Sequence, residues 1–148
     1  MNIVKTIDQY NIKYVYFCDS IKNNIINDGN FIRIFYSTPL LVFNGIYIYV
    51  NIGYVYIEKY YNKFKCSFDL IQYQHIIEKI KVIEEDILRK VNITDKIPQY
   101  KIYEQLKNGN IKIFSESVDK IKNTFLLKIS GIWETKNEYG LTYKFINI

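Results

Sequence analysis

The chain has 148 residues, with 20 basic and 15 acidic side chains, one His and two Cys. This length suits one domain over residues 1–148, and a hydrophobic content of 49% excludes a disordered chain. Two cysteines are too few for a disulfide-rich scaffold or a cysteine-rich zinc module. Because no apolar signal segment opens the chain, the expected location is intracellular and reducing. The net charge of +5, without a run of like charge, permits nucleic-acid binding but does not require it.

The composition is strongly skewed, with 28 Ile, 15 Tyr and no Ala. Ile, Lys, Asn and Tyr have AT-rich codons, so the excess of tyrosine reflects codon usage as well as selection on the protein. Tyrosine content alone is therefore weak support for a surface that stacks on bases.

An uncharged stretch over residues 34–57 is long enough to span a bilayer. Pro39, Gly45 and Gly53 interrupt it, and its β-branched and aromatic residues alternate with a period of two. Such a pattern is typical of consecutive strands, so no membrane partner is expected.

The first half of the chain reads as a meander of strands. The expected strands are Lys13–Cys18, Phe31–Tyr36, Gly45–Val50, Tyr54–Lys59 and Lys63–Asp69. Residues Asn51–Gly53 could close one hairpin and Tyr60–Asn62 the next, since Asn and Gly tolerate positive φ.

The middle of the chain changes to a helical period. Apolar residues recur every three or four positions, which predicts an amphipathic helix over about 73–91. They are Ile76, Ile80, Ile83, Ile87 and Val91.

After this helix, Pro98 fits the first turn of a second helix over Gln99–Leu106, and Gly109 suits a left-handed cap. Ile111–Phe114 reads as a short strand. Thr124–Glu134 and Glu138–Ile146 then alternate as the two strands of a C-terminal hairpin.

These elements predict a mainly β or α+β fold. Two forms remain open: an OB-like barrel, or a curved antiparallel sheet with the long helix lying across it. In either form the C-terminal hairpin completes the sheet.

The sequence predicts no catalytic or metal site. His75 is the one imidazole, and it is not spaced with Cys18 or Cys66 as zinc ligands are. The six glycines are isolated, so there is no phosphate-binding loop. We therefore expect a protein that is not an enzyme and needs no cofactor.

Binding is the remaining function. Single-stranded nucleic acid is held by lysine and arginine together with aromatic rings that stack on bases. Two sets of residues combine these types on predicted strands. The first set is Tyr47, Tyr49, Tyr54 and Tyr56. The second set is Arg33, Lys112, Lys128, Trp133, Lys136, Tyr143 and Lys144.

The segment from Ile102 to Ile146 carries the motif LKISGIWE followed by YGLTYKF. It resembles OB-fold single-stranded-DNA-binding proteins of nucleocytoplasmic large DNA viruses, which are similar to phage replication proteins of the same kind. The resemblance implies an OB-like barrel, sequence-independent binding of single-stranded DNA, and a role in viral replication, recombination or repair. A host cytoplasm, a viral factory or a virion would be the implied location.

The alternative is a structural or assembly protein. In that case the tyrosine-rich strands would form an exposed apolar patch through which copies of the chain associate. The two hypotheses differ in whether a basic, aromatic surface is left open to a nucleic acid.

Overall fold

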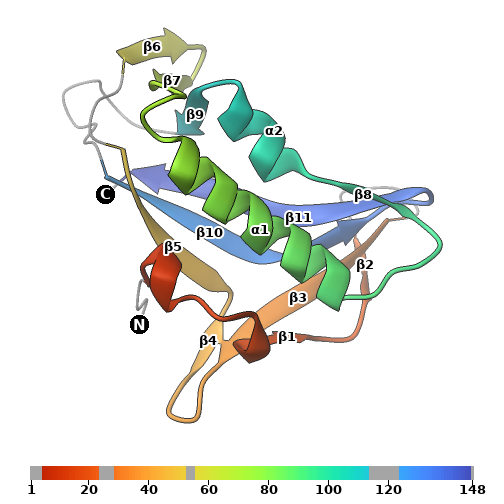
Figure 1. The fold of residues 1–148 in the computed structure, drawn as a ribbon. Coiled ribbons are helices and arrows are strands. Elements are labelled where there is room, and N and C mark those ends of the chain that lie inside the picture. The colour runs from red at the N-terminus through yellow and green to blue at the C-terminus, as the bar shows by residue number, and fades with distance from the viewer. Residues whose placement is uncertain (1–4, 24–28, 53–55, 114–123, 148) are drawn as a thin grey trace.

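The structure is a computed structural model that describes residues 5–23, 29–52, 56–113 and 124–147. Strands dominate these ranges, and two α-helices lie against them (Figure 1). The larger sheet contains β1 (Val15–Phe17), β2 (Ile21–Asn23), β3 (Gly29–Ser37), β4 (Val42–Asn44), β5 (Ile46–Asn51), β8 (Ile97–Gln99), β10 (Thr124–Glu134) and β11 (Glu138–Asn147). The smaller sheet contains β6 (Tyr56–Tyr60), β7 (Lys63–Ser67) and β9 (Asn110–Ile113). The helices are α1 (Gln74–Lys90) and α2 (Lys101–Lys107), with the short 3-10 helices η1 (Ile7–Gln9) and η2 (Ile12–Tyr14) near the N-terminus.

β10 joins the parts of the larger sheet. Its first half pairs with β5 and its second half with β3, while β11 pairs with it along its whole length. The register shifts between Ile129 and Gly131, so Ser130 is the extra residue of a β-bulge. Bulges bend a strand and increase its twist, and the larger sheet is strongly curled into a half-barrel.

α1 lies across one face of this curled sheet (Figure 1). Its buried apolar side chains face the sheet and merge with the buried residues of both sheets and α2 into one core cluster. Each buried isoleucine contributes about 1.5–3 kcal/mol relative to an exposed one. The apolar side chains of α1 that are buried are Ile77, Ile80, Ile83, Ile87 and Leu88.

The predicted fold class is confirmed. The chain is mainly β, with a curled sheet, one long amphipathic helix and a C-terminal hairpin formed by β10 and β11. The sequence left two forms open, and this half-barrel is compatible with the OB-like one. The predicted turn at Tyr60–Asn62 joins β6 to β7, with Tyr61 at a φ of 56°.

The prediction for Pro98 was wrong. The structure places it in β8, which runs parallel to β11, and α2 begins only at Lys101. β8 lies at one end of the strand order of the larger sheet, next to β11. A proline cannot donate a ladder hydrogen bond, so this short outer position tolerates it.

The predicted hairpin between the strands around Tyr49 and Tyr56 was also wrong. β5 pairs with β10 in the larger sheet, whereas β6 pairs with β7 in the smaller one. Gly53 of the predicted turn and the first two residues of the predicted strand Tyr54–Lys59 lie outside the described residues. The strand that pairs with β5 is distant in sequence, so local turn signals could not identify it.

Glu84 links the two helices from inside the core. Its side chain is fully buried on α1, and its carboxylate accepts hydrogen bonds from the backbone N–H groups of Ile102 and Tyr103 at 3.0 and 2.9 Å. These donors lie in the first turn of α2, which has no side-chain cap of its own. Burial raises the pKa of Glu84 from 4.5 to about 7, although the two N–H donors oppose this shift.

We predict that Glu84 makes the stability of the fold depend on pH. Its pKa is higher in the folded chain, so folding holds the proton more tightly, and stability falls as the pH rises from about 4.5 to 7. Urea unfolding of the wild type and of Glu84→Gln should show their difference changing by roughly 1–3 kcal/mol across this range, since one pKa unit corresponds to about 1.4 kcal/mol. A difference that stays constant with pH would contradict the assignment.

Candidate nucleic-acid interface

The outer face of the larger sheet, opposite α1, carries a row of three cross-strand neighbours. Lys128 on β10 is the register partner of Tyr47 on β5 and of Lys144 on β11. Residues next to Lys128 along β10, Leu127 and Ile129, are buried in the core, so the three side chains of the row point to the other side. The Nζ atom of Lys128 lies 5.5 Å from the centroid of the Tyr47 ring, within cation–π distance.

The cations on this face form no ion pair with an acidic group of the described residues. Lys128 and Lys144 lie directly opposite each other, and like charges in this position destabilise a sheet. Arg33 on β3 is exposed on the same face, because its register partner is Gly131 and its neighbours Ile32 and Ile34 are buried. None of these three cations forms an ion pair with a carboxylate in the described part of the chain.

Two aromatic rings extend the face beyond the bulge. Phe31 on β3 and Trp133 on β10 are register partners, and both are half-buried. A Cβ atom added to Gly140 would lie 2.7 Å from Cζ2 of Trp133, and one added to Gly131 would collide with the ring of Phe31. The two glycines of the hairpin motif therefore make room for these rings.

The structure brings six of the predicted binding residues to one face of the larger sheet. We call this surface the outer face. Its members are Arg33, Tyr47, Tyr49, Lys128, Trp133 and Lys144, and Phe31 joins them. Sequence reasoning missed Phe31, although its alternation with Arg33 along one predicted strand already placed the two side chains on one side.

Three other predicted residues lie elsewhere, and a fourth is outside the described residues. Tyr56 and Lys112 are exposed on the smaller sheet, and Lys136 is exposed in the turn between β10 and β11. Tyr54 lies outside the described residues. The predicted pairing of the tyrosines on one surface therefore holds for Tyr47 and Tyr49 but does not extend to Tyr56.

Tyr143 points to the helix side of the sheet. Its register partner is Ile129, whose side chain is buried, and its hydroxyl donates to Oε1 of Gln105 on α2 at 2.7 Å. Burial, together with nearby Glu84 and Glu104, raises the pKa of Tyr143 to about 12. The ring is thus engaged with α2 and is not part of the outer face.

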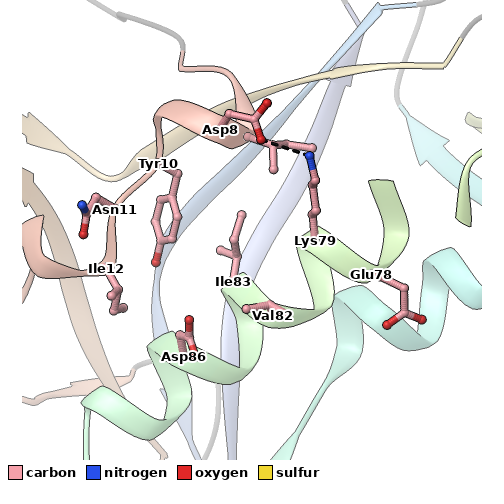
Figure 2. A pocket seen from close by; sticks show the side chains of 10 residues that line it. Asp8, Tyr10, Asn11, Ile12, Glu78, Lys79, Val82, Ile83 and Asp86 are labelled. Carbon is pink, nitrogen blue, oxygen red and sulfur yellow. Dashed lines mark hydrogen bonds and ion pairs between the residues drawn. The ribbon is translucent and has the colours of Figure 1, made fainter. Parts of the chain in front are cut away.

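A pocket of about 530 Å³ lies between the N-terminal 3-10 segment and α1 (Figure 2). Val82 and Ile83 contribute an apolar wall, whereas Asp8, Glu78 and Asp86 add three carboxylates. Two of these are paired on the surface, since Asp8 accepts from Nζ of Lys79 at 3.0 Å and Asp86 accepts from Nη1 of Arg89 at 3.2 Å. Carboxylates repel phosphate groups, so this pocket does not suit a nucleic acid.

The described histidine, cysteine and carboxylate side chains do not assemble into a metal site. Among the described residues, no group of three His, Cys, Asp or Glu side chains is arranged to hold a metal ion. His75 is exposed near the start of α1, and burial in β7 raises the pKa of the Cys66 thiol to about 11. No described helix is both long and apolar enough to cross a membrane.

Comparison of the chain with known protein families, with curated proteins and with solved structures finds no match in any of the three.

Tyr10 lines the pocket between the N-terminal 3-10 segment and α1, and the state of its hydroxyl affects stability. The Tyr10 hydroxyl is buried and forms no hydrogen bond with the described residues, whereas the Tyr36 hydroxyl accepts from the backbone N–H of Asn11 at 3.0 Å. A buried polar group without a partner costs about 1–3 kcal/mol. In urea unfolding, Tyr10→Phe should keep or increase the free energy of unfolding, and Tyr36→Phe should lower it by about 1 kcal/mol. Equal losses in the two variants would show that the Tyr10 hydroxyl is satisfied in solution.

Proposed function

We propose that this chain binds single-stranded nucleic acid, with DNA favoured, on the outer face of its larger sheet. The observation that carries the proposal is the row formed by Tyr47, Lys128 and Lys144, in which the Lys128 ammonium lies beside the Tyr47 ring and Lys144 lies opposite Lys128. Neither lysine forms an ion pair with a carboxylate of the described residues. Lysine and arginine attract phosphates, and each base that stacks on an aromatic side chain contributes about 1–3 kcal/mol.

The dimensions of the outer face suit a short single-stranded nucleic acid. Lys128 and Trp133 are five residues apart on β10, which corresponds to about 16 Å at 3.3 Å per residue. The bulge at Ser130 restores Trp133 to the side on which Lys128 lies, so rings occur at both ends of the face and cations between them. A single-stranded nucleic acid lying along β10 would meet rings that stack on bases and cations that bind phosphates. None of these contacts depends on which base is present.

The proposed role in a cell is the protection of single-stranded DNA. Binding without sequence preference protects exposed single strands, as required in replication, recombination or repair. The resemblance of the C-terminal segment to viral single-stranded-DNA-binding proteins supports this role and a viral setting.

One observation favours the alternative, a structural or assembly protein. The turn between β3 and β4 exposes consecutive aliphatic side chains, with Leu40 and Val42 exposed to 90% and 69%. Clustered exposed apolar residues are typical of protein contact sites. In this alternative, self-association would bury this turn or the tyrosines of the outer face.

We predict that removing the two opposed lysines weakens binding to oligo-dT. In a fluorescence-anisotropy titration, Lys128→Gln/Lys144→Gln should bind more weakly than wild type at low salt. Its slope of log affinity against log salt should be smaller by up to about 1.4, because each phosphate that is no longer neutralised reduces the slope by about 0.7.

The matched control removes two lysines from α1, on the opposite side of the sheet. Lys79→Gln/Lys81→Gln changes the net charge equally and should retain both the affinity and the salt slope of the wild type. Equal losses of affinity in the two double variants would contradict a defined site. Absence of binding even at low salt, with a dimer or larger species in light scattering, would favour the structural alternative.

A further inference from the structure

A second basic site lies between α2 and the smaller sheet. It is a pocket of about 350 Å³ that includes two of the predicted residues absent from the outer face, Lys112 and Tyr143. Lysines and side-chain amides dominate its lining. The lysines and amides of the lining are Lys65, Lys101, Lys112, Gln105, Asn108 and Asn110.

Two of the lysines are held opposite each other by the sheet. Lys65 on β7 and Lys112 on β9 are register partners, while their neighbours Cys66 and Ile111 are buried. The alternation of the strands therefore directs both lysines to the pocket side. Two ammonium groups on the same side of the smaller sheet make the pocket attractive to an anion.

Among the described lining residues of this pocket, lysines outnumber carboxylates. Glu104 is the one carboxylate among the described lining residues, and its Oε2 lies 3.9 Å from Nζ of Lys101. Both side chains of this pair are about half exposed, at 50% and 49%, and exposed pairs of this kind are weak. Lys101 is thus available to an anion that enters the pocket.

Gln105 supplies an oriented donor. Its Oε1 accepts the hydrogen bond from the Tyr143 hydroxyl, so the remaining group of the amide is its NH2. This NH2 donates to no partner among the described residues. Tyr143 therefore acts on the pocket indirectly: by occupying the oxygen of the Gln105 amide, it leaves the NH2 for a ligand.

We propose that this pocket binds a phosphate group, held by the ammonium groups of Lys65, Lys101 and Lys112 and by the NH2 of Gln105. Lysine serves as a point charge for phosphate, and the amide adds a directional hydrogen bond. The site is separate from the outer face and does not depend on the function proposed for that face. Its ligand is either a phosphate monoester, such as a strand end or a free phosphate, or the phosphodiester of a strand.

The test follows the side-chain amide signals of Gln105, Asn108 and Asn110 in an NMR titration of the full chain. The probes are inorganic phosphate, oligo-dT with a 5′-phosphate and the same oligo-dT without it. A saturable shift of the Gln105 NH2 signal with any probe supports the site, and the effective probes distinguish a monoester from a phosphodiester. No shift with all three probes would overturn the proposal.

Gln105→Glu provides the sharpest variant. It keeps an oxygen for the Tyr143 hydroxyl but replaces the donor with a negative charge, so it should weaken binding of the effective probe at least about tenfold, or about 1.4 kcal/mol. The control Gln74→Glu makes the same change at the exposed first residue of α1 and should bind as wild type does. Unchanged binding by Gln105→Glu, with wild-type stability in urea, would overturn the proposal. Phosphate binding retained in Lys128→Gln/Lys144→Gln would show that the pocket acts independently of the outer face.

Discussion

The packing of α1 against the larger sheet determines which residues are available for binding. The apolar side of α1 covers one face of the sheet, and the alternation of β10 then directs every second side chain away from the core. A shift of one residue in register would bury Lys128 and expose Leu127, at a large cost in apolar burial. The composition of the outer face is thus fixed by the same contacts that stabilise the fold.

The β-bulge at Ser130 extends that surface. Lys128 and Trp133 are an odd number of residues apart, so in a regular strand they would point to opposite sides. The extra residue resets the alternation, and Ile129 and Ile132 both reach the core while Lys128 and Trp133 both point outward. Gly131 and Gly140 leave space for the rings of Phe31 and Trp133, so bulge, glycines and rings together shape this part of the face.

Local patterns predicted much of the fold and only part of the candidate site. The helix over about 73–91 and the C-terminal hairpin carry strong periodicity and were found. The pairing of β5 with β10 joins segments more than 70 residues apart, and no local signal reports it. Tyr143 was misplaced although it directly precedes Lys144 on one strand, where adjacent side chains point to opposite sides. Lys112 was misplaced because β9 joins a different sheet from β10.

The one tryptophan of the chain, Trp133, lies on the outer face and gives a direct probe of it. A labelled oligo-dT can be titrated while its anisotropy and the tryptophan emission are recorded together. If the oligonucleotide binds to the outer face, the tryptophan emission should be quenched in a saturable way that follows the anisotropy. Salt should reverse this quenching. An oligonucleotide that binds while the tryptophan emission stays constant would place the strand on another surface and contradict the account.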